Sequence, residues 1–189
     1  MPADLSKMQA AVRAILDALG EDASREGLRR TPERVAEMFA EVLDGIGRDP
    51  AEVLATPFRE EHYEGAVVVR DIPFYSLCEH HMLPFYGHAH IGYIPCGKLA
   101  GASKLARALD VVAHRLQLQE RMTEQLGDAI MKALEPEGVV VVIEAEHLCM
   151  VMRGARKQGS RVVTSVARGP FGKGDKGRDE LFSLVRGQE

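Results

Sequence analysis

The sequence predicts an α+β fold, in which a helical extension precedes an antiparallel four-stranded sheet. Three observations support this prediction. Two segments with helical periodicity come first, two pairs of β-rich segments follow, and two further amphipathic segments lie between those pairs. Helices grouped between strand pairs indicate a β-β-α-α-β-β unit with antiparallel strands. We expect a helical region at residues 1–63 and one sheet domain at residues 64–189.

The N-terminal region contains two predicted helices. Apolar residues recur at helical spacing from Leu5 to Leu19, and Gly20 ends the first helix. Thr31 is suited to the N-cap of the second helix and Pro32 to its first turn. Residues 45–63 have the composition of a polar connection. The apolar stripe that the second helix is expected to bury comprises Val35, Met38, Phe39, Val42 and Leu43.

Four β-branched or alternating segments predict strands at residues 66–75, 84–95, 139–143 and 161–166. A four-stranded sheet has two exposed edges, which proteins cover or pair, so we predict a ring-like homo-oligomer. A short helix is expected at residues 181–185. Two helices are predicted between the strand pairs from apolar residues at helical spacing, which are Leu105, Leu109, Val112 and Leu116, then Met122, Leu126, Ile130 and Leu134.

The composition argues against several classes of protein. A net charge of -4 and 5% aromatic residues, with no Trp, argue against nucleic-acid binding. Three cysteines are too few, and odd in number, for a secreted disulfide framework. The N-terminal sequence has no apolar run typical of a signal peptide or membrane span, so we expect a cytoplasmic protein. Residues 65–189 carry a net charge of +2 against -6 for residues 1–64, so an anionic ligand should prefer the second part.

Residue types that bind metals gather in a Cys-Glu-His-His motif at residues 78–81 and in a His-Leu-Cys motif at residues 147–149. Cys78 and His81 are three positions apart, so one turn of backbone can direct both side chains to one point. One distant cysteine brings the set to three ligands, which leaves zinc a coordination position for water. Water held in that position ionises near neutral pH and becomes a nucleophile. The pattern therefore indicates a metal-dependent hydrolase.

Spacing alone leaves the details of the metal site open. The third ligand could be Cys149 or Cys96, of which Cys96 lies in a Pro-Cys-Gly turn. The ion could be structural rather than catalytic, with His80 or His147 as a fourth ligand. Cys78 and Cys149 could also form a disulfide.

Four motifs together resemble GTP cyclohydrolase I. They are Ser-Leu-Cys-Glu-His-His at residues 76–81, Gly-Ala-Ser-Lys-Leu-Ala-Arg at 101–107, Gln-Leu-Gln-Glu-Arg at 117–121 and Glu-His-Leu-Cys-Met at 146–150. The resemblance extends from Thr31 to the C-terminal helix. It implies the tunnelling fold (T-fold) and a homodecamer of two face-to-face pentamers. It also implies conversion of GTP and water to formate and 7,8-dihydroneopterin triphosphate, the first step towards folate and related pterins.

The resemblance assigns roles to the residues of the reaction centre. His147 matches the family's proton donor, which would protonate N7 of guanine because C8 of a neutral purine is a poor electrophile. His80 matches its partner at the metal-bound water, and Ser103 matches the hydroxyl that handles protons at the ribose. The residues that match the zinc ligands are Cys78, His81 and Cys149.

The resemblance also assigns the substrate contacts. Glu120 matches the carboxylate that binds guanine, where it would accept hydrogen bonds from N1–H and the 2-amino group together. Adenine lacks this pair of donors, so Glu120 would set base identity, and Gln119 is a secondary candidate for the same pocket. Residues 151–168 contain five basic residues and no acidic one, which suits a triphosphate. The residues that match triphosphate contacts are Lys104, Arg107, Arg153 and Arg34.

Three features outside these motifs carry weaker expectations. His88 and His90 alternate on a predicted strand, but the zinc would already have its ligands, so this pair is not expected to bind metal. Glu146 should point away from its strand neighbour His147 and have little effect on the pKa of His147. Allosteric feedback is possible, but no motif defines it.

The sequence leaves two alternative functions. A deazaguanine nitrile reductase of the T-fold class needs a cysteine nucleophile and NADPH, and the Cys-Glu-His-His motif argues against it. A non-enzymatic, zinc-stabilised assembly protein would have no need of Ser103, Lys104 and Glu120 together.

Overall fold

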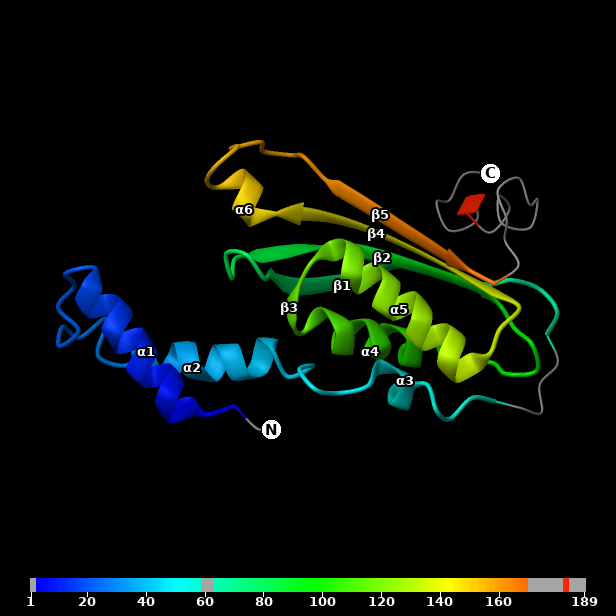
Figure 1. The fold of residues 1–189 in the computed structure, drawn as a ribbon, viewed down its shortest axis with the longest axis horizontal. Coiled ribbons are helices and arrows are strands. Elements are labelled where there is room, and N and C mark those ends of the chain that lie inside the picture. The colour runs from blue at the N-terminus through cyan, green and yellow to red at the C-terminus, as the bar shows by residue number, and fades with distance from the viewer. Residues whose placement is uncertain (1–2, 59–62, 170–181, 184–189) are drawn as a thin grey trace. The chain divides into compact units, whose positions relative to one another are not determined.

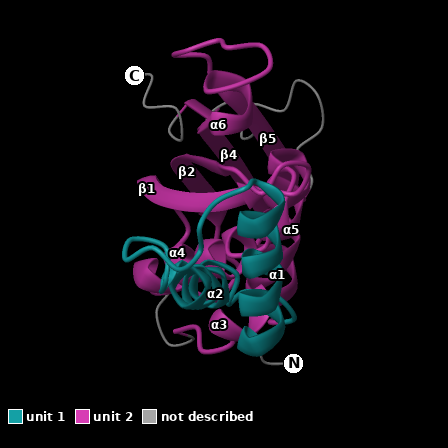
Figure 2. Cartoon of the chain, turned by 90° about the vertical axis from the view of Figure 1, so that its left-hand side faces the viewer, with its two compact units in different colours: residues 1–47 teal, residues 48–189 magenta. Residues whose placement is uncertain are grey.

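The computed structural model describes residues 3–58, 63–169 and 182–183. The chain divides into two compact units, residues 1–47 and residues 48–189, which Figure 2 shows in different colours. The first unit contains helix α1 (Leu5–Ala18) and helix α2 (Thr31–Val42). The side chain of Asp4 caps α1 by accepting from the backbone N–H of Lys7 at 3.1 Å. Both helices occur where the apolar periodicity predicts them.

Two details of the predicted α2 are wrong. The N-cap is Arg30, and Thr31 is the first helical residue. The hydroxyl of Thr31 donates to the backbone carbonyl of Gly27 at 3.4 Å. The buried residues of α2 are Pro32 and Ala36, whereas Met38 is 44% exposed. The helix therefore buries small residues, and the rest of the predicted stripe is only half-buried.

The second unit is built on a sheet with the strand order β3-β1-β2-β4-β5. β1 pairs antiparallel with β2, β2 with β4, and β4 with β5. The predicted α+β class with an antiparallel sheet is confirmed. A two-residue strand, β3, adds a parallel pairing beside β1 that the sequence did not indicate. The strands are β1 (Val67–Cys78), β2 (Pro84–Ile94), β3 (Leu116–Gln117), β4 (Gly138–His147) and β5 (Val162–Arg168).

Helices α4 (Ala102–Ala113) and α5 (Gln119–Leu134) pack on one face of this sheet (Figure 1). The four apolar residues predicted for α5, at positions 122, 126, 130 and 134, are all fully buried. They meet the alternating apolar residues of β4, which point to the same face. Truncating one of these α5 side chains to alanine is expected to cost about 2–5 kcal/mol of stability, because a cavity remains.

Three short elements depart from the sequence prediction. Residues 45–63 are more than a polar connection, because they contain helix α3 (Pro50–Val53) and the buried Leu54. α4 ends at Ala113, so Leu116 belongs to β3 and is 36% exposed. Helix α6 (Leu148–Val151) follows β4 directly. The helix predicted at residues 181–185 lies outside the described residues, apart from residues 182–183.

The antiparallel topology brings several chain segments to one end of the sheet, at the left in Figure 1. β1 ends there and β2 begins there, β4 ends there before α6, and β3 leads into the start of α5. The hydroxyl of Ser76 donates to the backbone carbonyl of Ala113 at 2.7 Å, so the end of α4 is fixed beside the end of β1. Both cysteine-histidine motifs therefore lie at this end. Within the described residues, no helix combines the length and apolar character required to cross a bilayer.

Candidate active site

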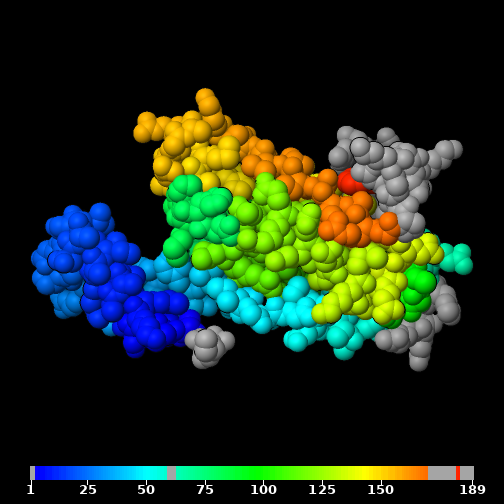
Figure 3. Space-filling model, viewed as in Figure 1, coloured from blue at the N-terminus to red at the C-terminus, as the bar shows by residue number. Residues whose placement is uncertain are grey.

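Cys78, His81 and Cys149 form the one group of three or more metal-binding side chains found in the described part of the chain. Their ligand atoms all lie within 4.8 Å of one another. Cys78 is the buried last residue of β1, His81 is exposed in the β1–β2 turn, and Cys149 is half-buried in α6. In Figure 3 the yellow-to-orange surface around α6 lies against the green surface of that turn.

The β1–β2 turn is held by backbone hydrogen bonds at its base. The N–H of Cys78 donates to the carbonyl of Leu83 at 2.9 Å, and the N–H of Met82 donates to the carbonyl of Cys78 at 2.8 Å. Met82 has a φ of 54°, a left-handed conformation that residues with a side chain rarely adopt. This tight reversal directs His81 back towards Cys78.

The donor set suits zinc. Two sulfurs and one imidazole are typical of zinc sites, and three protein ligands leave a fourth position open. Burial raises the pKa of the Cys149 thiol, and the neighbouring Cys78 raises it further. A divalent cation between the two sulfurs would oppose both effects, because it stabilises thiolates. All three cysteines are free, and Cys96 is exposed and outside the group.

His147 lies beside this group but is not part of it. It is the last residue of β4 and the N-cap of α6. Its ring stacks on the buried ring of Phe85, with centroids 4.5 Å apart and an interplanar angle of 5°. Its Nε2 is 2.7 Å from Oε1 of Gln119. Burial lowers the pKa of His147, and the charge of Glu120 in the first turn of α5 opposes that shift.

Two further side chains flank the metal-binding group. Nη1 of Arg153 donates to Nε2 of His81 at 3.0 Å, which places a guanidinium directly beside a candidate ligand. His80 is exposed, and its ring meets that of His81 edge to face with centroids 6.2 Å apart. Neither His80 nor His147 joins the group as a fourth ligand within the described residues.

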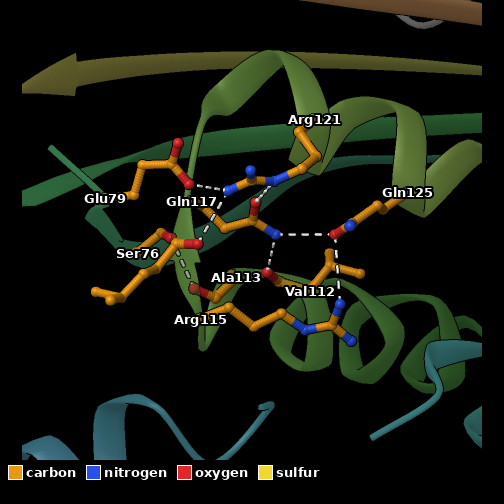
Figure 4. A network of polar contacts seen from close by, with 9 residues as sticks. Ser76, Glu79, Val112, Ala113, Arg115, Gln117, Arg121 and Gln125 are labelled. Carbon is orange, nitrogen blue, oxygen red and sulfur yellow. Dashed lines mark hydrogen bonds and ion pairs between the residues drawn. The ribbon is translucent and has the colours of Figure 1, made fainter. Parts of the chain in front are cut away.

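A polar network connects the β1–β2 turn to the start of α5 (Figure 4). Arg121 forms an ion pair with Glu79, the residue after Cys78. Nε of Arg121 also donates to Oε1 of Gln117 at 3.1 Å, and the N–H of Glu79 donates to the backbone carbonyl of Gln117 at 3.0 Å. Gln117 is 1% exposed and donates from Nε2 to the carbonyl of Val112 at 2.7 Å. The turn is therefore attached to β3 and α5 as well as to the sheet.

The remaining predicted contacts lie on two other helices. Ser103, Lys104 and Arg107 occupy the first half of α4, and the first and last of these are exposed. Ser103 precedes Ala113 by ten residues, so it lies about 15 Å along the helix from the end that touches β1. Arg34 is exposed on α2 of the first unit.

Comparison with known proteins identifies the family. Residues 8–186 match the family model described as GTP cyclohydrolase I. The GTP cyclohydrolase 1 of Halalkalibacterium halodurans is 55% identical over 185 residues, which cover 97% of this chain and 98% of the relative. That of Pelotomaculum thermopropionicum is 56% identical over 98% of both chains. The chain belongs to the GTP cyclohydrolase I family.

Among solved structures, the apo form of an archaeosine synthase QueF-like protein aligns with 59% of this chain. The TM-score is 0.46 and the sequence identity is 16%, a likeness too weak to inform the function.

Within this GTP cyclohydrolase I chain, the His88 and His90 pair lies on the sheet face opposite the helices, in a pocket of about 400 Å³. The pocket is lined by charged residues of both signs, and the pair forms no metal-binding group within the described residues. Nδ1 of His90 accepts from the N–H of Asp71 at 3.2 Å. On the same face, the hydroxyl of Tyr86 donates to Glu146 at 3.2 Å. Glu146 thus points away from His147, as predicted, and does not contribute to the pKa shift of His147.

Sequence reasoning missed the second layer of the site. The sequence analysis predicted neither the burial of Gln117 and Gln119, which are each 1% exposed, nor the ion pair between Arg121 and Glu79. An alternation signal existed, because residues 117 and 119 flank Leu118 at the spacing of one strand face. Because glutamine is polar, this spacing alone predicts an exposed face for Gln117 and Gln119. Only their hydrogen-bond partners, which the sequence does not show, explain their burial.

Proposed function

We propose that this protein is a zinc-dependent GTP cyclohydrolase. It hydrolyses GTP at C8, releases formate and yields 7,8-dihydroneopterin triphosphate, the first step of tetrahydrofolate and pterin biosynthesis. Membership of the GTP cyclohydrolase I family supports the activity. The observation that supports the mechanism is the grouping of the ligand atoms of Cys78, His81 and Cys149 within 4.8 Å. His147 lies next to this group, as the N-cap of the helix that contains Cys149.

The first chemical step divides between the metal-binding group and two histidines. Cys78, His81 and Cys149 would hold the zinc ion, which would supply the Lewis acidity that makes water a nucleophile near neutral pH. His147 donates a proton to N7 of the guanine, which draws electrons from C8. His80 stands beside His81 on the exposed side of the turn and orients the attacking water.

Glu120 recognises the base. It lies in the first turn of α5, directly after Gln119, and its charge acts on His147. A carboxylate in that place accepts from N1–H and the 2-amino group of guanine, in a pair that adenine cannot form. The residue that recognises the base, Glu120, and the residue that donates the proton, His147, therefore lie at the same end of the sheet.

Basic side chains bind the triphosphate, and Ser103 handles protons at the ribose. Arg153 lies 3.0 Å from His81, so it contacts the phosphate nearest the reaction centre. Its guanidinium suits bidentate contact with phosphate oxygens. Lys104, Arg107 and Arg34 supply further positive charges for the triphosphate.

The catalytic domain at residues 64–189 has the T-fold and assembles into a decamer of two pentameric rings. Among the residues that the structure describes, β5 has a partner only in β4, and β1 meets β3 at only two residues. Each sheet edge therefore presents backbone N–H and C=O groups that a second copy can pair with. The enzyme acts in the cytoplasm, where its three free cysteines stay reduced.

One assay tests the proposal. Purified holoprotein is incubated with GTP, and the products are analysed for formate and for a pterin that fluoresces after oxidation. ATP serves as the matched control and should give neither product. A chelator should abolish turnover while the oligomer persists, because packing rather than metal holds the subunits. Absence of formate from zinc-loaded protein would contradict the proposed function, and unfolding on chelation would favour a structural ion.

A further inference from the structure

Gln119 has a set of contacts that a substrate-binding residue does not need. Its side chain is 1% exposed, although it lies at the start of α5 beside the exposed Glu120. Its Nε2 is 3.0 Å from the backbone carbonyl of Ile143, 3.0 Å from that of Val162 and 3.1 Å from the hydroxyl of Thr164. Its Oε1 faces Nε2 of His147 at 2.7 Å. Every polar atom of the amide is therefore used within the protein.

These partners fix the orientation of the amide. Backbone carbonyls can only accept hydrogen bonds, so the group that faces Ile143 and Val162 must be the NH₂. The hydroxyl of Thr123 donates to the backbone carbonyl of Gln119 at 2.7 Å, so it accepts in its 2.6 Å contact with the hydroxyl of Thr164. The hydroxyl of Thr164 gives its hydrogen to Thr123 and can therefore only accept from the amide of Gln119. The oxygen of the amide is left facing His147.

The amide orientation in turn fixes the tautomer of His147. An amide oxygen can only accept, so Nε2 of His147 must carry a hydrogen and donate it. Stacking on Phe85 holds the plane of the ring. Within the described residues, Nδ1 of His147 has no hydrogen-bond partner, so it is the ring nitrogen left available to a ligand.

We propose that Gln119 is a positioning residue, which acts through His147 and not on the guanine. It holds His147 in the Nε2–H tautomer with Nδ1 directed to the substrate. Nδ1 is then the ring nitrogen that acts on N7 of GTP in the proposed function, while Nε2–H stays bonded to Gln119. This inference rests on the proposed function for the identity of the proton acceptor.

The first test separates positioning from base recognition. Gln119→Met keeps the length of the side chain but removes its hydrogen bonds. We expect kcat to fall about 100-fold, within the range of a misplaced general acid, while KM for GTP changes less than about threefold and zinc content is unchanged. Thr123→Val is the matched control, because it disturbs the same buried cluster without touching His147. A large rise in KM with kcat retained would assign Gln119 to the base, and equal behaviour of both variants would reduce it to a packing residue.

The second test is a double-mutant cycle. If Gln119 acts through His147, adding Gln119→Met to His147→Ala should lower kcat no further. A further loss approaching 100-fold would show that Gln119 acts independently and would overturn the proposal. Wild-type protein that does not turn over GTP would instead refute the proposed function.

The third test needs no substitution at Gln119. Zinc-loaded wild-type protein with ¹⁵N-labelled histidine is studied by NMR, and the His147 signals are identified by their loss in His147→Ala. The neutral ring should carry its hydrogen on Nε2. A hydrogen on Nδ1 would overturn the proposal, whether or not the Gln119 variant folds and whether or not the protein hydrolyses GTP.

Discussion

The two ends of α4 lie in regions of different character. Its C-terminal end adjoins the reaction end of the sheet, which we define as Cys78, His81, His147 and Cys149 with their partners. There, backbone bonds, a stacked ring and a buried amide fix the side chains. Its N-terminal half carries Lys104 and Arg107, whose side chains have no hydrogen-bond or ion-pair partner within the described residues. The side chains at the reaction end are thus held by contacts within one chain, whereas Lys104 and Arg107 have no such contacts to hold them.

The difference predicts how severely each region responds to substitution. Groups at the reaction end have fixed geometry, so their loss should remove a step. In the proposed function the groups on α4 share the charge of the triphosphate, so the loss of one should be partly compensated by the others.

The largest effect is expected from Cys149→Ser. It replaces a thiolate with a poor zinc ligand, so both zinc and turnover should be lost, with kcat/KM reduced at least about 1,000-fold because metal activation of water is removed. Metal analysis of the purified protein and the formate assay measure the two effects. Cys96→Ser, at an exposed thiol outside the group, is the control and should retain zinc and activity. Full zinc content in Cys149→Ser would mean that another residue completes the ligand set.

The next effect is expected from Glu120→Ala. It removes a carboxylate that would accept two hydrogen bonds from guanine, each worth about 1.5–3 kcal/mol for a charged partner. The dissociation constant for GTP should rise at least about 100-fold, while zinc content stays the same. Binding can be measured by calorimetry with a non-hydrolysable GTP analogue. Glu124→Ala, one turn later and also exposed, is the matched control. Unchanged affinity in Glu120→Ala would remove Glu120 from base recognition.

A smaller effect is expected where the network of Figure 4 holds the metal-binding turn. Arg121→Gln breaks the ion pair with Glu79 and should weaken zinc retention about 10–100-fold, as outer-shell substitutions do. Competition with a chromogenic chelator measures this. The exchange Glu79→Arg with Arg121→Glu should restore part of the loss. Lys132→Gln, which breaks the exposed pair with Asp49, is the control and should leave zinc affinity unchanged.

The smallest effect is expected from Lys104→Ala or Arg107→Ala taken singly. Each removes one charge from a proposed set of several, so KM for GTP should rise about 5–10-fold with kcat nearly unchanged. The rise should shrink at high salt because the interaction is screened. Steady-state kinetics at two ionic strengths measure it. A kcat loss as large as that of His147→Ala would show that α4 takes part in the chemistry.

The sequence predicted the main elements of the fold because their signals are local. The apolar residues of α5 repeat every four positions without interruption, and all four are buried. The same rule failed at Leu116, since it continues the spacing of α4 while the chain has already left the helix at His114. Helix α3 was missed because four residues give no periodicity, although Asp49 and Pro50 are an N-cap and first-turn pair.

The sequence predicted the site only where the residue types themselves indicate a chemical role. Cysteine and histidine in short motifs indicated a metal-binding group, although their spacing left Cys149 and Cys96 open as the third ligand. The role now proposed for Gln119 could not be read from the sequence, because two of its partners are the backbone carbonyls of Ile143 and Val162. Every residue has a backbone carbonyl, so the sequence cannot indicate which carbonyls accept a hydrogen bond from Gln119. Only the packing of α5 against β4 and β5 reveals these contacts.

The sheet depends little on the three metal-binding side chains. Only Cys78 belongs to a long strand, whereas His81 sits in a short reversal and Cys149 in a single helical turn. A chain made during zinc shortage would therefore keep its sheet intact and could be stored without its ion. It would regain competence as soon as the supply recovered, with no new round of protein synthesis.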